Sequence, residues 1–177
     1  PESVRAVANL ALFVRTSKKL PLVAQFGTPM LLGGLAPLVS SAPSSPFAAA
    51  HTDAASLEES FRMAAFALSL MAREGEAQQA LVAHMGFLET VEALLETEDE
   101  ELLLHGAAIV GGLLTAPNED SFARGFVAAQ ILASRVLRYV LALAAQASSR
   151  ALAADTRSWL VTTIAMVADH ASSRAKL

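Results

Sequence analysis

The stretch LVAHMGFLETVEALLETEDEELLLHGAAIVGGLL, residues 81–114, places two apolar segments on either side of an acidic block, TEDEE at 97–101. In the first segment Val91 and Leu95 recur at helical spacing, whereas glutamates such as Glu92 fall on the other side. The second segment is rich in Gly and Ala, which is typical of a helix that packs closely on its neighbours. The pattern predicts two helices joined by a tight, solvated corner whose acidic residues favour the start of the second helix. The alternative is that the acidic block docks a basic partner.

Three short stretches elsewhere align with the start of this segment, and their flanks align as well. They are LVAQFG at 22–27, LVAHMG at 81–86 and FVAAQI at 126–131. Amphipathic runs follow them at 30–39, 87–96 and 132–143. Ala-rich runs precede them at 4–14, 61–72 and 103–114, and a last run of this Ala-rich type occupies 157–168. The order of long, short and medium helix therefore recurs about every 40–45 residues. Nothing alternates with period two, so we expect an all-α fold.

The interval between the first two stretches is 59 residues, compared with 45 between the second and third. The difference is explained by SSAPSSPFAAAHTDAAS at 40–56, which contains Pro, Ser and Ala without periodicity. We expect a flexible insertion loop there.

The repeated unit resembles the armadillo (ARM) repeat family. The likeness rests on the small-residue helix AAFALSLMA, on the short helix that ends at Gly86, and on FLETVEALLE after it. It covers nearly all of the chain, although Ile131 stands where the other two stretches have Gly27 and Gly86. The resemblance implies a right-handed α-solenoid of about three to four armadillo-like three-helix repeats over residues 1–177. Other helical solenoids and a non-repeating helical bundle are the alternatives.

The N-terminal end of this array is predicted to be incomplete. The chain opens directly in a helix of the third type, whose Val4, Val7, Leu10 and Leu12 have no preceding helices of their own unit. Terminal repeats otherwise expose their stacking face. We therefore expect a fragment of a longer array, or self-association or partner binding through the N-terminal face.

Composition limits the other classes of protein. Apolar residues make up 54% of the chain, above the usual range of about 45–50%, but no apolar run reaches the roughly 20 residues of a membrane span. The longest candidate, 102–116, contains His105. There is no Cys, which excludes disulfides and favours a reducing compartment. With no leader visible, we expect a cytoplasmic or nuclear location.

The net charge of −4 hides an acidic centre. Residues 1–52 carry +3, residues 53–120 carry −12 and residues 121–177 carry +5. The central segment would repel phosphate, so nucleic acid is not an expected partner.

No pattern of catalytic or metal-binding residues is visible. His51, His84, His105 and His170 occur at no metal-binding spacing. The sequence also lacks a GxSxG turn, a GxGxxG loop and a Walker motif. The pair Gly111-Gly112 lies inside a helical run and predicts close helix packing. We therefore expect no enzyme activity, no cofactor and no metal.

The armadillo resemblance implies a concave face, lined by the third helices, that binds a peptide or a helix of another protein. Importin-type members repeat a Trp followed four residues later by an Asn. Here only Asn9 and Trp159 match, in different units, so binding of nuclear-import signals is not expected. The groove candidates are Arg5, Asn9, Arg62, Phe66, Ser69, Arg73, His105, Ile109, Trp159 and Thr163. For the apolar candidates and for Trp159, packing in the core is the alternative to contact with a partner.

The sequence thus predicts a non-enzymatic protein-protein interaction scaffold. A second hypothesis comes from AREGEAQQALVAHMGF at 72–87, which is similar to armadillo-type nucleotide-exchange factors of Hsp70 and implies Hsp70 as the partner. A structural component of the cytoskeleton or axoneme is a third hypothesis.

Overall fold

The computed structural model describes residues 5–6, 8–10, 20–39, 54–115, 121–146 and 152–174. Every regular element in these ranges is a helix, and no strand occurs among them. The complete helices are α2 (Leu20–Val39), α3 (Ala54–Ala72), α4 (Gly75–Ala83), α5 (Phe87–Glu96), α6 (Glu100–Thr115), α7 (Ser121–Ala133), α8 (Val136–Gln146) and α9 (Ala154–Arg174). The predicted all-α class is confirmed.

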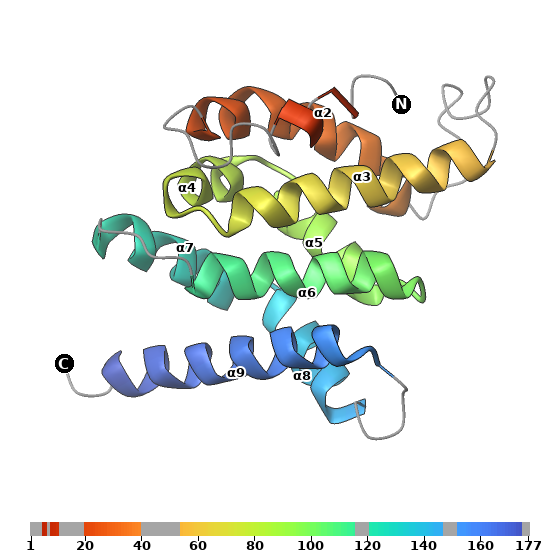
Figure 1. The fold of residues 1–177 in the computed structure, drawn as a ribbon. Coiled ribbons are helices and arrows are strands. Elements are labelled where there is room, and N and C mark those ends of the chain that lie inside the picture. Colours follow the sequence, from red (N-terminus) through yellow and green to blue (C-terminus); the bar gives the residue numbers. More distant parts are fainter. Residues whose placement is uncertain are drawn as a thin grey trace.

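Helices α3, α6 and α9 form one layer, in which they lie side by side and run in the same direction (Figure 1). Helix α6 is the middle member and packs on α3 and α9. Helices α5 and α8 form a second row that packs on α6 and α9, and α2 packs on α3, α4 and α5 at one end. Each helix therefore packs on helices that are near it in the chain. The apolar core follows this arrangement from Leu31 in α2 to Leu160 in α9.

The small residues of α6 allow helices to approach it from three sides. A Cβ atom on Gly106 would lie 3.0 Å from a side-chain atom of α5. A Cβ on Gly111 would lie 2.3 Å from Cε3 of Trp159 in α9, and one on Gly112 would lie 3.1 Å from the carbonyl group of Ala72 in α3. The prediction that the Gly-Gly pair serves close helix packing is confirmed.

A buried amide joins three of these helices. Gln78 of α4 is 1% exposed, and its Nε2 donates to the carbonyl oxygens of Ala72 at 3.0 Å and Gly112 at 2.9 Å. Ala72 is the last residue of α3, where a carbonyl has no partner within its own helix. The Gln78 side chain therefore satisfies a buried acceptor and links the ends of α3 and α6.

The predicted order of long, short and medium helix holds for α3, α4 and α5, but it is wrong for the next unit, because α7 has 13 residues and α8 has 11. Both α4 and α7 begin before the aligned stretches at 81–86 and 126–131. Helix α4 begins at Gly75 and α7 at Ser121. Gly86 has a φ of 87°, in the left-handed region that suits glycine, and it separates α4 from α5. The predicted loop 40–56 extends too far at its C-terminal end, because residues 54–56 already belong to α3. Its residues 40–53 lie outside the described part of the chain.

The expected break in the first repeat is wrong. Instead of a short helix ending at Gly27 and a second helix over 30–39, α2 runs continuously through Pro29. Pro29 has no N–H to donate to the carbonyl of Gln25, four residues earlier. That carbonyl accepts a hydrogen bond from Nε2 of His84 at 3.0 Å instead. A tertiary contact thus replaces a hydrogen bond that the proline removes from the helix.

This contact predicts coupling between His84 and Pro29. Replacing His84 with alanine should lower the free energy of unfolding by about 1 kcal/mol, because the Gln25 carbonyl loses its donor. In a Pro29→Ala background the restored N–H can take that place, so the same replacement should have a smaller effect. Urea denaturation of the four chains measures the coupling as a double-mutant cycle. Equal losses in both backgrounds would contradict the assignment.

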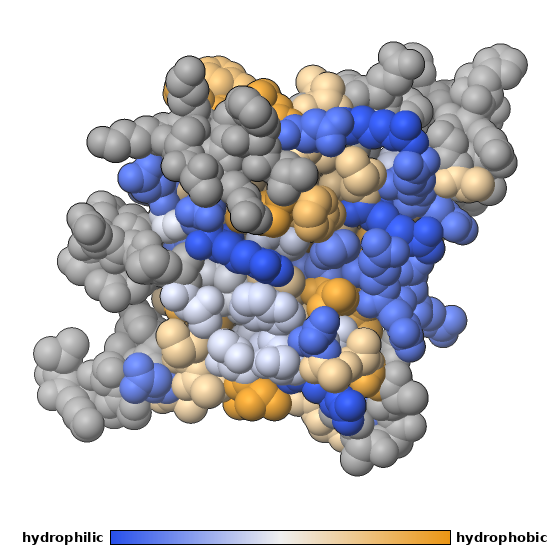
Figure 2. Space-filling model, viewed as in Figure 1, coloured by the Kyte–Doolittle hydropathy of each residue, from blue (hydrophilic) through white to orange (hydrophobic). Residues whose placement is uncertain are grey.

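The acidic block forms the predicted corner. Helix α5 ends at Glu96 and α6 begins at Glu100. Oδ1 of Asp99 accepts the backbone N–H groups of Glu101 and Leu102, both at 3.0 Å, which caps α6. Figure 2 shows hydrophilic side chains gathered over this end of α3 and α6. The prediction of a solvated corner that starts the next helix is confirmed.

The cap also makes stability depend on pH. Burial raises the pKa of Asp99, but hydrogen bonds from the Leu102 amide and the Arg62 guanidinium outweigh it, so the pKa lies below its usual value. A carboxyl whose pKa is lower in the folded state stabilises the fold above its unfolded pKa, and this contribution is lost as the pH falls through the folded value. It should therefore begin to decrease near pH 4 and be lost as the pH falls further.

The variant Asp99→Asn tests this dependence, since asparagine also caps helices but carries no charge. At pH 7 we expect it to be less stable by about 0.5–1 kcal/mol, the range for a partly exposed ion pair. Chemical denaturation followed by circular dichroism across the acid range should show the difference shrinking below about pH 4. A difference that does not vary with pH would exclude the carboxylate as its source.

No single helix in the described ranges is long and apolar enough to cross a membrane. The segments Gly125–Ala133 and Val136–Gln146 reach the required length and hydropathy only together, and they are bent by 70° at the break between them.

Candidate protein-binding groove

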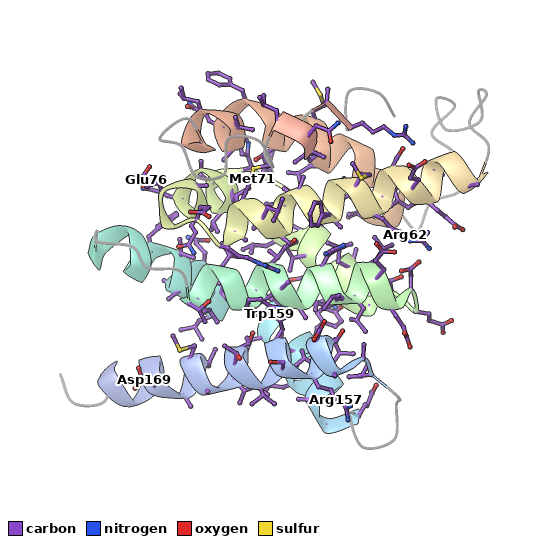
Figure 3. The ribbon with its side chains drawn as sticks, viewed as in Figure 1. Arg62, Met71, Glu76, Arg157, Trp159 and Asp169 are labelled. Carbon is purple, nitrogen blue, oxygen red and sulfur yellow. The ribbon has the colours of Figure 1, made fainter. Side chains whose placement is uncertain are left out.

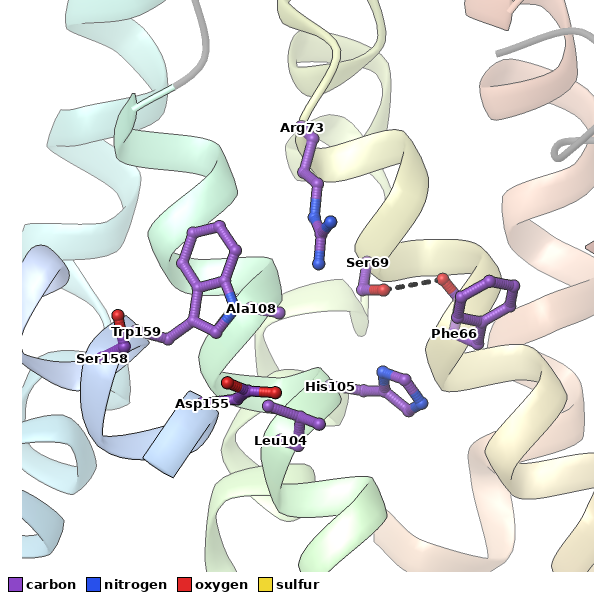
Figure 4. Close-up of a pocket in the computed structure, with 9 residues that line it drawn as sticks. All are labelled: Phe66, Ser69, Arg73, Leu104, His105, Ala108, Asp155, Ser158 and Trp159. Carbon is purple, nitrogen blue, oxygen red and sulfur yellow. Dashed lines mark hydrogen bonds between the residues drawn. The ribbon is translucent and has the colours of Figure 1, made fainter. Parts of the chain in front are cut away.

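A cavity of about 300 Å³ opens on the layer formed by α3, α6 and α9 (Figure 4). Its walls come from all three helices, and they combine aromatic, small and charged side chains. The lining residues are Phe66, Ser69, Arg73, Leu104, His105, Ala108, Asp155, Ser158 and Trp159. A cavity of this size lies at the lower end of the range for small-molecule pockets, which suits one or two side chains of a bound peptide.

Trp159 forms one side of the groove, between α6 and α9 (Figure 3). Its ring can approach α6 only because Gly111 has no side chain. The guanidinium carbon of Arg73 lies 5.0 Å from the centre of the ring, within the range of a cation–π contact. The indole is thus held between the α6 backbone and a cation in the turn that follows α3.

Arg73 differs from the other cation of the acidic central segment. Arg62 contacts the carboxylates of Asp99 at 2.8 Å and Glu101 at 3.2 Å. Within the described ranges Arg73 forms no ion pair. Its side chain is exposed, and Cγ of that side chain packs against Gly112. Its guanidinium therefore remains available to a negative group in the groove.

His105 and Phe66 form the opposite wall, with ring centres 5.7 Å apart. Burial lowers the pKa of His105, and nearby Arg73 acts in the same direction, while Glu101 and Asp99 oppose it. The resulting pKa lies below the ordinary value of about 6.5, so the ring is neutral at pH 7. Ser69 donates its hydroxyl hydrogen to the carbonyl of Phe66 at 2.8 Å.

The structure brings together only some of the predicted groove residues. Those that line the cavity are Phe66, Ser69, Arg73, His105 and Trp159. Arg62 lies at the acidic corner (Figure 3), Arg5 pairs with Glu59, and Asn9 is exposed outside the cavity lining.

Two further groove candidates do not border the cavity. Ile109 is fully buried in the core, because this position of α6 faces its packed neighbours. Thr163 is also buried, and its hydroxyl donates to the carbonyl of Trp159 at 2.8 Å. Neither side chain is open to a partner.

Sequence reasoning missed Leu104, Ala108, Asp155 and Ser158, which also line the groove. A signal was present, because Asp155 precedes Trp159 by one helical turn and therefore lies on the same face. Leu104 and Ala108 are related in the same way in α6.

Other surfaces carry exposed apolar side chains. Leu22, Phe26 and Met30 follow one face of α2, with Phe26 73% exposed. Leu10 is exposed too, whereas Val4, Val7 and Leu12 lie outside the described residues. Binding through the N-terminal face stays a prediction.

Among the described residues, no group of three or more His, Asp or Glu side chains is placed to hold a metal ion. No family model matches the chain, and no curated protein and no solved structure matches it either.

Proposed function

We propose that this chain is a right-handed α-solenoid of armadillo-like repeats that binds a segment of another protein in the groove between α3, α6 and α9. In this proposal α3, α6 and α9 are the third helices of successive repeats, and their shared face is the concave binding surface. The recurrence of a long helix followed by two shorter ones, together with packing between neighbouring helices, supports the repeat assignment.

The observation that carries the binding proposal is the composition of the cavity. Three equivalent helices each contribute a large or charged side chain to it, namely Phe66, His105 and Trp159, with Arg73 over the indole. Aromatic residues and Arg are enriched in the energetically dominant parts of protein interfaces. The small volume favours side chains of a peptide or helix over a large cofactor.

A selection experiment tests this proposal. Peptides selected from a displayed library on the immobilised chain should change the emission of Trp159, which is the only Trp in the chain. Ser158→Phe should weaken their binding by about tenfold or more, because the new ring fills the groove from an exposed position without removing core atoms. Met85→Ser, which alters a 97% exposed residue outside this groove, is the matched control. Peptides that bind both variants like the wild type would contradict groove binding.

A further inference from the structure

We infer that the groove recognises an extended partner segment in which a single Asp or Glu side chain binds Arg73 and an adjacent large apolar side chain enters the cavity. This inference rests on the proposed function and adds the chemistry of the partner.

Arg73 stands without a carboxylate partner among the described residues of a strongly acidic segment. The segment 53–120 contains two cations, Arg62 and Arg73, among fourteen carboxylates. Arg62 is surrounded by Asp99, Glu101 and Glu58. Arg73 has no carboxylate partner in the described part of the chain, although the segment offers so many.

The side chain of Arg73 is already oriented for binding. Its stem lies against the backbone of Gly112, and its guanidinium lies over the ring of Trp159. Figure 4 shows the guanidinium nitrogens directed into the groove, above Ser69 and Ala108. A guanidinium held in this way loses less side-chain freedom when it binds a carboxylate through two parallel hydrogen bonds.

The apolar walls define the neighbouring residue of the partner. Phe66, Leu104, Ala108 and the indole of Trp159 surround a space of about 300 Å³ next to the cation. His105 adds no charge at pH 7, because burial lowers its pKa. A leucine, methionine or phenylalanine beside the acidic residue would bury apolar surface there.

The charges around the groove limit the partner to a single acid. Glu58, Glu100 and Glu101 lie at the N-terminal ends of α3 and α6, where Figure 2 shows a hydrophilic surface. Asp155 lines the cavity itself, and in Figure 4 it lies near Leu104, at the opposite end of the cavity from Arg73. A run of acidic residues would meet these carboxylates, whereas one acid placed at Arg73 would not.

Arg157, two residues before Trp159 in the sequence, does not change this assignment. Arg157 is exposed and lies on the side of α9 away from α6 (Figure 3). It is not among the residues that line the cavity. Arg73 is therefore the cation that a segment in the groove would meet.

The test uses three pools of fluorescein-labelled peptides of about eight residues, a length that an extended segment needs to cross neighbouring helices. The pools share randomised flanks and a central pair, in which the second residue is Leu, Met or Phe. The first residue of the pair is Glu, Gln or Lys. Fluorescence anisotropy measures binding to the whole chain, and Trp159 emission reports occupancy of the groove.

We expect the Glu pool to bind about tenfold or more tightly than the Gln pool, and the Lys pool to bind most weakly. Arg73→Gln should remove the preference for Glu. Arg138→Gln, the same change at an exposed residue of α8, should retain it. Asp155→Asn should retain or increase it, because a nearby negative charge is removed.

Two results would overturn the inference in different ways. Tighter binding of the Lys pool, or a preference for Glu that survives Arg73→Gln, would exclude recognition of a carboxylate while leaving groove binding intact. Failure of every pool to bind and to change Trp159 emission would remove both the inference and the proposed function. Circular dichroism of each variant confirms that loss of binding is not loss of folding.

Discussion

Replacing Gln78 with alanine is expected to lower the free energy of unfolding by about 2–5 kcal/mol. The amide donates to two carbonyl oxygens, those of Ala72 and Gly112, and the side chain is 1% exposed. Alanine would leave both acceptors without this donor and would open a cavity between α3, α4 and α6. An acceptor buried without a partner costs about 1–3 kcal/mol, and the cavity adds to this.

The adjacent residue provides the control. Gln79 is the same residue type in the same helix but is exposed. Gln79→Ala should change the stability by less than about 0.5 kcal/mol, as surface substitutions usually do. Denaturation in urea or guanidinium chloride, followed by circular dichroism, measures both variants. Similar losses at the two positions would show that the bridge between the helices contributes little.

The second large effect is expected at Gly111, where leucine should lower the free energy of unfolding by about 2–3 kcal/mol. The first atom of the new side chain alone would lie 2.3 Å from Cε3 of Trp159, so the indole or the whole of α9 must move. Leucine favours helices by close to 1 kcal/mol over glycine, and a net loss would therefore come from overpacking. Displacement of the indole should also shift the emission of Trp159 to longer wavelength.

Gly125 in α7 is the matched control for this substitution. A Cβ there has no atom of the described residues within 4 Å, so leucine should be neutral or stabilise the chain by up to about 1 kcal/mol through helix propensity. The two variants differ in the space available and not in the residue introduced. Equal stability of both would mean that Trp159 is not packed on Gly111 in solution.

Helix periodicity and small-residue patterns predicted much of this fold. The Ala- and Gly-rich run at 103–114 lies in the middle helix of the layer because only small residues allow packing on several sides. The acid run at 97–101 became a corner because it cannot be buried between apolar neighbours. These features depend on local sequence and on side-chain size, which can be read directly.

The continuity of α2 could not be predicted in this way. Gly27 and Pro29 are local signals for a break, and the helix continues through them while His84, far away in the sequence, bonds the carbonyl that the proline leaves free. Such compensation depends on tertiary contacts. The sequence of α2, which shows little helical periodicity, gives no sign of such tertiary contacts.

The groove was predicted in part for a related reason. Ile109 and Ala108 are neighbours in α6, separated by about 100° around the helix axis. Helix spacing places both near the shared face, and both side chains are buried. Only Ala108 borders the cavity, although the larger Ile109 was the predicted residue.

Because α2 packs on α3, α4 and α5, and α9 packs on α6 and α8, the first and last of these helices are held by separate sets of partners. Loss of α9 would uncover α6 and α8 but would leave the contacts of α2 unchanged. Thermal fraying or proteolysis can therefore start at the α9 end and advance from one helix to the next. The same property would allow strain imposed at one end of the molecule to be absorbed there, far from the other.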